Sequence, residues 1–383
     1  MPKKIDFSEF RVFSSFKMND HSVIIRSMNF SETIFLTGFP GFIAERLVKS
    51  LAKPDTQFFL LVQTQFVEKA MGDIEKISAE TATPLENFAL IEGDITQKNL
   101  GVSVKDLESV RAETTDIYHL AAIYDLAVAR NPAFLVNLEG TKNVNEFAKS
   151  LPNLRRYNYI STCYVAGKRN GEILETELAH DAGFRNYYEE TKYLAEMEVE
   201  NLKGELPITI FRPSVVVGDS ETGETAKYDG IYHVIFYLKK FPALLRLVNV
   251  GNKAVKLNLV PVDFVVEGIA ALAKDESATG KTIALADPNP MTTQEICDVI
   301  SEAITGKKSV LTPPMKVVEF SLSLPFSPAI SGLPLSGVPY FFLSQTYDTH
   351  IADELLSAHN IACPSFKSYA KNLIKFVEKH PKL

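Results

Sequence analysis

The chain has 383 residues, of which 46% are hydrophobic and 23% are charged, so it can bury the core of one large or two modest globular domains. Its formal net charge of -7 argues against nucleic-acid binding, because nucleic-acid-binding proteins usually carry a basic excess. Three widely separated cysteines, Cys163, Cys297 and Cys363, form no metal-ligand spacing and favour a reducing, cytoplasmic setting without a bound metal.

The first thirty residues differ from the rest of the chain. Residues 1–30 lack the sustained apolar segment of a secretory signal, and we expect them to form an extension outside the main fold. No stretch of the sequence approaches the ~20 apolar residues of a transmembrane span. We therefore expect no transmembrane span, while a peripheral membrane contact stays open.

From Thr33 onward, short apolar runs alternate with helical patterns. These runs and similar short segments rich in β-branched and aromatic residues predict strands at 33–36, 58–62, 88–91, 116–119, 156–160 and 207–211. The helical patterns lie at 132–150, 186–202, 293–304 and 365–379. This alternation is typical of an α/β protein with a doubly wound parallel sheet, and such sheets bind ligands at the carboxyl ends of their strands.

A glycine turn follows the first predicted strand, where Thr37–Ala44 reads T-G-F-P-G-F-I-A. Gly38 can take the turn without a side-chain clash, and Gly41 lets the backbone approach a pyrophosphate. A helix that begins near Phe42 would present free N–H groups and the positive end of its dipole to the phosphates. An ordinary strand-to-helix turn is the alternative, and a second motif downstream argues against it.

That second motif pairs Tyr188 with Lys192, which lie four residues apart and share one face of a predicted helix. A free tyrosine has a pKa near ~10, and a neighbouring ammonium lowers it by stabilising the phenolate. The pair then suits proton donation to a carbonyl that receives a hydride. Ser161 and Thr162 end the fifth predicted strand, and either hydroxyl can hold the substrate oxygen or simply satisfy loop backbone. The same tyrosine–lysine spacing also arises by chance on solvated helices.

Taken together, the motifs resemble the extended short-chain dehydrogenases/reductases. T-G-x-x-G-x-x-A is followed in family order by G-D-I at Gly93–Ile95, H-L-A-A at His119–Ala122, S-T-C-Y-V-A-G and Y-x-x-x-K. N-Y-Y-E-E-T-K, F-R-P-S-V-V-V-G-D-S and V-P-V-D-F-V are similar to the male-sterility branch, which holds fatty acyl reductases and thioester-reductase domains. The resemblance covers roughly residues 33–288.

The resemblance implies a set of site residues. Thr162 matches the catalytic Ser/Thr, Tyr188 the catalytic acid, and Lys192 the residue that tunes it and binds the ribose. The positions that match cofactor contacts are Thr37, Gly38, Phe39, Pro40, Gly41, Phe42, Ile43, Gln63, Asp94, Ile95, Ala121, Ala122, Asn137, Tyr188, Lys192, Pro213 and Val215.

The end of the second strand bears on the choice of cofactor. Gln63 stands where many relatives place an Arg that clamps a 2′-phosphate, and Gln65 or Lys69 can assist it. An acidic residue there would instead accept the ribose hydroxyl of NAD. The resemblance implies NADP(H) more than NAD(H), and NAD(H) stays open.

The resemblance also implies a domain plan. A Rossmann-type NAD(P)-binding domain spans 31–275, with a substrate-cleft insertion near 219–258, and a smaller C-terminal substrate or lid region spans 276–383. Two segments rich in aromatic and aliphatic residues, Tyr228–Phe241 and Leu322–Phe342, either border the substrate cleft or pack in the hydrophobic core.

The implied activity is NAD(P)H-dependent reduction of an acyl thioester or long-chain aldehyde by a monomer or homodimer. The substrate arrives free or as a CoA or carrier-protein thioester, since nothing in the chain resembles a carrier domain. A 3β-hydroxysteroid-type dehydrogenase and a nucleotide-sugar epimerase or dehydratase are the alternatives. A non-catalytic NAD(P)-sensing regulatory protein is an alternative of another class.

Overall fold

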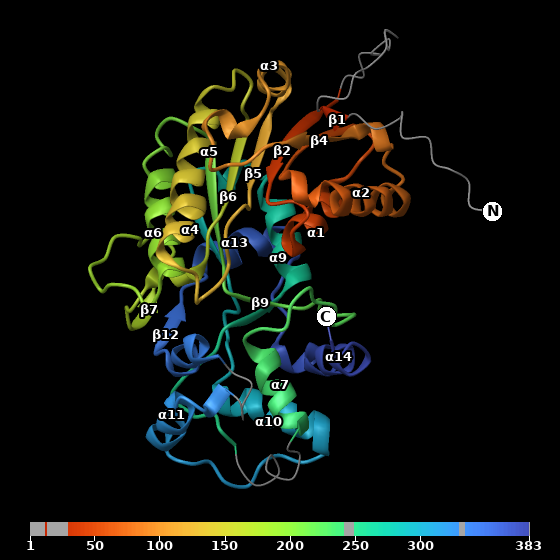
Figure 1. Ribbon diagram of the computed structural model, residues 1–383. Helices are drawn as coiled ribbons and strands as arrows, with labels where there is room; N and C mark the ends of the chain where they lie inside the picture. The colour runs from red at the N-terminus through yellow and green to blue at the C-terminus, as the bar shows by residue number, and fades with distance from the viewer. Residues whose placement is uncertain (1–11, 14–29, 241–248, 329–333, 383) are drawn as a thin grey trace, which may run out of the picture.

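The computed structural model describes residues 12–13, 30–240, 249–328 and 334–382 (Figure 1). At its centre is a parallel sheet of eight strands in the order β1-β4-β3-β2-β5-β6-β8-β11. The strands are β1 (Val12–Phe13), β2 (Glu32–Thr37), β3 (Thr56–Val62), β4 (Phe88–Glu92), β5 (Asp116–His119), β6 (Arg156–Ile160), β8 (Ile208–Pro213) and β11 (Thr282–Leu285). This order is that of a Rossmann-type doubly wound sheet, as the sequence predicts.

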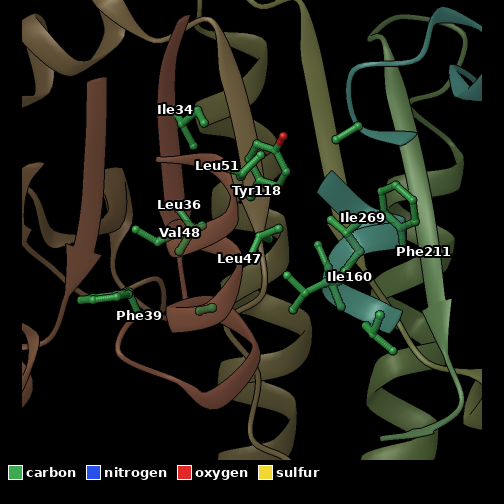
Figure 2. Packing of buried hydrophobic residues seen from close by; sticks show 14 of the residues in the cluster. Ile34, Leu36, Phe39, Leu47, Val48, Leu51, Tyr118, Ile160, Phe211 and Ile269 are labelled. Atoms are coloured by element: carbon green, nitrogen blue, oxygen red, sulfur yellow. The ribbon is translucent and has the colours of Figure 1, made fainter. Parts of the chain in front are cut away.

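Helices cover both faces of the sheet (Figure 1). One face carries α1 (Phe42–Leu51), α2 (Val67–Thr81), α9 (Val262–Leu272) and α13 (His350–Ala358). The other carries α3 (Val104–Glu113), α5 (Gly140–Lys149) and α6 (Tyr187–Glu200). Ile34 and Leu36 of β2 enter the first core, which Figure 2 shows, and Phe35 enters the second. Burial on both faces explains why the strands read as continuous apolar runs.

The secondary-structure predictions for this part of the chain are largely confirmed. The runs 116–119 and 156–160 match β5 and β6 residue for residue, and α6 begins one residue after its N-cap, Asn186. The predicted helix 132–150 is divided into α4 (Arg130–Ala133), a π-helical stretch (Phe134–Glu139) and α5. Short 3₁₀ helices complete the connections at Thr64–Phe66, Leu85–Asn87, Lys98–Gly101, Cys163–Ala166 and Glu276–Ala278.

A second lobe lies beyond the carboxyl ends of the strands, in the lower half of Figure 1. Its core is built by β9 (Val215–Val217), β10 (Leu259–Pro261), α7 (Ile231–Lys240), α10 (Thr293–Thr305) and α14 (Phe366–Lys379). Tyr232, Ile300 and Leu373 are fully buried there. The lobe continues with α11 (Met315–Ser323) and the 3₁₀ helix η8 (Leu335–Phe342), and β12 (Gln345–Tyr347) pairs with β7 (Gly171–Ile173).

Two of the predicted boundaries are wrong. β11 lies beyond residue 275 and yet joins the large sheet, where Ile283 pairs with Phe211, because the chain returns to the sheet before it completes the second lobe. Val12 pairs with Leu90 of β4, so β1 belongs to the sheet edge rather than to an outer extension. The remainder of residues 1–29 lies outside the described residues. Within the described ranges, no helix is long and apolar enough to cross a membrane.

Candidate active site

The direction of the strand order reverses between β2 and β5. The chain moves outward from β2 through β3 to β4 and then returns to β5 on the other side of β2. Such a switch point opens a crevice at the carboxyl ends of the strands. A cavity of about 850 Å³ lies there, bordered by the glycine loop after β2 and by the segments that follow β3, β5, β6 and β8.

The glycine loop is shaped as a phosphate cradle. A Cβ on Gly38, whose φ is +94°, would lie 2.9 Å from the amide nitrogen of Ala121, and one on Gly41 would lie 2.6 Å from the Gly38 carbonyl oxygen. Gly41 is the N-cap of α1 and supplies no side-chain cap, so the first N–H groups of the helix, at Phe42 and Ile43, border the cavity without such a partner. Uncapped N–H groups at the positive end of a helix dipole fit a pyrophosphate.

The far end of the cradle carries the residues predicted to hold the adenosine. The Gln63 side-chain amide donates to the Asp94 carboxylate at 2.9 Å, and both side chains line the cavity. Lys69 also lines it, and its ammonium donates to the Pro40 carbonyl at 2.9 Å and to Asp73 at 2.7 Å. A single cation therefore lies beside the glycine loop at this end of the described cavity.

Tyr188 lies in the first turn of α6 and is 6% exposed, with its surface on the cavity. Thr162 lies beside it on the cavity wall, and the Tyr124 ring packs edge-on against it at 5.2 Å between centroids. Burial raises the pKa of Tyr188, and the neighbouring Thr162 side chain opposes that rise. The phenol therefore stays protonated at neutral pH and can act as a proton donor.

Lys192 lies one turn further along α6. Its ammonium donates to the Tyr159 hydroxyl and to the Ile160 carbonyl, both at 2.9 Å. Burial lowers the pKa of Lys192 to about 8, opposed by the nearby Glu196 carboxylate. Burial of the phenol raises the pKa of Tyr188, so the lowering of that pKa expected from Lys192 is not the net outcome in this arrangement.

Ser161 and Thr162 have different roles. The Ser161 hydroxyl bonds to the buried Glu196 carboxylate, which also accepts two hydrogen bonds from the Arg212 guanidinium at 2.6 and 2.8 Å. The Thr162 oxygen accepts a hydrogen bond from the Tyr164 amide at 3.2 Å and faces the cavity beside Tyr188. Thr162 is therefore the hydroxyl that a substrate oxygen can reach together with Tyr188.

A buried histidine connects the glycine loop to the floor of the site. The Thr141 hydroxyl donates to the Asn137 carbonyl at 2.7 Å, so its oxygen accepts from His119 Nε2 at 3.1 Å. His119 Nδ1 then accepts from the Thr37 hydroxyl at 2.7 Å. Burial lowers the pKa of His119 to about 3, which keeps the ring neutral. The H-L-A-A motif thus places a neutral histidine that fixes Thr37.

The cavity brings together nearly all of the predicted site residues. Asn137 is the exception, because it lies behind the lining. Its side chain accepts from the Ile123 amide at 2.8 Å and donates to the Thr191 hydroxyl at 3.0 Å, so it braces the loop after β5 against α6. The lining residues that match the predicted set are Thr37, Gly38, Phe39, Pro40, Gly41, Phe42, Ile43, Gln63, Asp94, Ile95, Ala121, Ala122, Thr162, Tyr188, Lys192, Pro213 and Val215.

Sequence reasoning missed two tyrosines at the site. Tyr124 lines the cavity beside Tyr188, and Tyr164 lines it while packing on Tyr340 of η8 at 4.6 Å between ring centroids. Tyr124 follows the H-L-A-A motif by two residues, so its position just after the end of β5 could have indicated that it lies at the site. Tyr340 comes from the second lobe, and no local pattern connects it to α6.

The chain is similar to known proteins in sequence and in fold. A family model of NAD-binding domains, described as Male sterility protein, matches residues 36–269. The fatty acyl-CoA reductase wat of Drosophila melanogaster is 26% identical over 278 residues, which are 63% of this chain and 54% of that protein. The alcohol-forming fatty acyl-CoA reductase of Simmondsia chinensis is 25% identical over 235 residues, or 47% of each. The chain spans about half the length of these curated relatives.

Solved structures agree on the fold. The terminal R domain from the myxalamid PKS-NRPS biosynthetic pathway superposes with a TM-score of 0.77 at 23% identity, over 92% of each chain. A thiolation-reductase di-domain from an archaeal non-ribosomal peptide synthetase has a TM-score of 0.72 at 20% identity, over 91% of this chain and 76% of that one. The family match covers most of the sheet and the glycine cradle, so the cofactor is NAD or NADP. The chain belongs to the male sterility protein family, within the extended short-chain dehydrogenases/reductases.

Proposed function

We propose that this protein uses NAD(P)H to reduce the carbonyl of an acyl thioester or a long-chain aldehyde. The observation that carries the proposal is that Tyr188 and Thr162 face the same cavity as the uncapped start of α1. The named activities of the fatty acyl-CoA reductases among the relatives support this substrate class.

The chemistry follows from the position of the two hydroxyls. Thr162 and Tyr188 both hydrogen-bond the carbonyl oxygen, which polarises the carbon toward a nucleophile. The nicotinamide cofactor, when bound, supplies a hydride to that carbon. Tyr188 gives its proton to the oxygen as negative charge develops there. With a thioester, this first step gives a hemithioacetal; its carbon–sulfur bond then breaks while its hydroxyl proton passes to the departing sulfur, so that an aldehyde and a free thiol leave. With an aldehyde, the product is an alcohol.

Lys192 acts on this step through position and charge. Its ammonium is fixed by Tyr159 and the Ile160 carbonyl at the floor of the cavity, one helical turn from Tyr188. A cation at that place stabilises the phenolate that remains after proton transfer. It is also the group that would hold the ribose of the cofactor, because it lines the cavity between the strand ends and the glycine cradle.

Three finer statements belong to this proposal. The cofactor is NADP(H) rather than NAD(H), because Lys69 offers a positive charge beside the cradle and Gln63 offers no carboxylate to a ribose hydroxyl. The thioester is carried by CoA or by a separate carrier protein. The residues that contact substrate and cofactor are those that line the cavity.

A direct assay tests the proposal. Loss of NADPH absorbance is followed with acyl-CoAs, straight-chain aldehydes, a 3-ketosteroid and a UDP-sugar at matched concentrations. Turnover of the acyl-CoAs or aldehydes, with none of the UDP-sugar, is expected. Turnover of the steroid alone would instead indicate a steroid-type dehydrogenase. Cofactor binding without turnover of any of the compounds would favour a regulatory protein.

A further inference from the structure

Glu196 is a fully buried carboxylate on α6, one helical turn beyond Lys192 and two turns beyond Tyr188. Residues four apart on a helix share one face, so the three side chains lie on the same side of α6. One oxygen of the carboxylate accepts two hydrogen bonds from the Arg212 guanidinium of β8, and the other accepts one from the Ser161 hydroxyl. The carboxylate is therefore held in one place, on the helix face that carries the proton donor.

Lys192 is a buried cation that needs an opposite charge nearby, because an ammonium that leaves water without one is strongly disfavoured. It is only 4% exposed, and its two hydrogen-bond acceptors, the Tyr159 hydroxyl and the Ile160 carbonyl, are neutral. The titratable and charged groups that face Lys192 are Tyr188 and Glu196 on α6, Tyr159 on β6, His119 on β5 and, through Glu196, Arg212 on β8.

Only one of these described groups is an anion. Burial raises the pKa of Tyr188 and of Tyr159 and lowers the pKa of His119, so the two phenols and the imidazole are neutral at physiological pH. Glu196 is left as the negative charge that faces the ammonium, and its attraction opposes the effect of burial on Lys192.

We propose that Glu196 is a positioning residue that keeps the Lys192 ammonium charged during the reduction. The inference rests on the proposed function and names the anion on which the charge at the floor of the site depends. Arg212 balances the carboxylate, so Glu196 stays ionised and takes no part in proton transfer. Without the carboxylate, Arg212 would be an unbalanced cation and would disfavour a second positive charge on Lys192.

The charge state of Lys192 is measured directly by NMR titration of isotope-labelled lysine side chains. An ordinary lysine titrates near pH ~10.4, whereas burial lowers the pKa of Lys192 to about 8, so its signal stands apart and Lys192→Met assigns it. Glu196→Gln keeps the shape of the side chain without its charge and should lower this pKa by about one unit or more. Glu196→Asp keeps the charge and should restore most of the difference.

Two further variants test whether the effect is local and electrostatic. Glu189→Gln is the matched control, because Glu189 is an equally buried carboxylate of α6 that is paired with Arg185 instead. It should leave the Lys192 titration in place, whatever it does to the rate. Arg212→Gln should raise the pKa of Lys192, since the carboxylate then lacks its other cation. This opposite shift decides the question if Glu196→Gln does not fold.

The outcomes separate this inference from the function on which it rests. An unchanged Lys192 titration in Glu196→Gln, or equal shifts in Glu196→Gln and Glu189→Gln, overturns the positioning role and leaves carbonyl reduction standing. Equal shifts in Glu196→Gln and Glu196→Asp also overturn it, because charge would not be the cause. The pH at which kcat/KM for NADPH falls should move with the titration in each variant, and a fixed limb contradicts the role. Absence of turnover with every carbonyl overturns the proposed function, whereas the titration needs no substrate and still decides whether Glu196 sets the charge on Lys192.

Discussion

The Tyr340 hydroxyl donates a 2.6 Å hydrogen bond to the Glu189 carboxylate, and so joins η8 of the second lobe to the first turn of α6. Glu189 is fully buried and is also held by the Arg185 amide at 2.8 Å and the Arg185 guanidinium at 3.2 Å. Tyr188 is the residue immediately before it. The second lobe therefore supports the turn of α6 that carries Tyr188.

The first prediction concerns this contact. Tyr340→Phe removes a hydrogen bond to a buried carboxylate, which typically costs about 1.5–3 kcal/mol, and also removes the acceptor of the Asn186 side-chain amide at 2.7 Å. We therefore expect the free energy of unfolding in urea to fall by at least about 1.5–3 kcal/mol. Tyr347→Phe is the control, because its hydroxyl donates to the neutral Gln345 amide at 3.3 Å and should cost about 1 kcal/mol or less. Equal losses in the two variants would contradict a stabilising role of the Tyr340 hydroxyl between Asn186 and Glu189.

The second prediction concerns proton donation. Tyr188→Phe should lower kcat by ~10²–10⁴-fold, because the phenol is lost while the glycine cradle and Lys192 remain. The dissociation constant of NADPH should change little, as measured by fluorescence titration. Tyr187→Phe alters the preceding, 41% exposed tyrosine and should keep nearly full activity. If Tyr188→Phe retained more than about half of the wild-type turnover, the proton would have to come from another group.

The third prediction concerns pH. Burial depresses the pKa of Lys192 to about 8, so the residue is charged below that pH and neutral above it. If the charged form is required, kcat/KM for the cofactor should fall as the pH rises through about 8. Tyr159→Phe removes an acceptor of the ammonium and thus disfavours the charged form. The falling limb should therefore move to lower pH in that variant.

A control for the pH prediction lies on the same strand. The Tyr157 hydroxyl donates to Asn145 at 2.7 Å rather than to Lys192, so Tyr157→Phe should leave the limb in place. The same lysine predicts how stability depends on pH. Folded Lys192 loses its proton near pH 8, whereas the unfolded lysine keeps it up to pH ~10.4, so the free energy of unfolding should rise between these two pH values. A limb that moved equally in both variants would argue for a general structural effect.

Much of this molecule follows from local patterns, and the rest does not. Buried strands such as β3 and β4 were predictable because apolar runs of four or five residues between turns are typical of buried strands. The glycine cradle and the Tyr188–Lys192 spacing were predictable because each depends on neighbours within one turn. The raised pKa of Tyr188 was not, since burial depends on the whole fold. The contact of Tyr340 with Glu189 and the pairing of β11 with β8 were missed. Both join segments far apart in the sequence, and such contacts leave no local pattern.

The last prediction concerns cofactor choice at Gln63. Its side-chain amide donates to Asp94 and carries no charge, so it does not repel a 2′-phosphate. It also offers no carboxylate to accept a hydrogen bond from the ribose hydroxyl of NAD. Lys69 is the cation at this end of the described cavity lining, and its partly exposed ammonium gives a screened attraction that weakens with salt. We expect NADPH to bind several-fold more tightly than NADH at low salt, with a smaller difference at high salt.

Variants of two lysines of α2 distinguish a local attraction between Lys69 and the 2′-phosphate from the effect of the overall charge of the protein. Lys69→Met should remove most of the difference between NADPH and NADH, because it deletes the charge beside the Pro40 carbonyl. Lys76→Met deletes the same charge from an exposed position of α2 outside the cavity lining and should leave the difference intact. Fluorescence titration measures the binding of both cofactors to wild type and to each variant at a low and a high salt concentration. Tighter binding of NADH by wild type at both concentrations would mean that Gln63 and Lys69 do not select the phosphate.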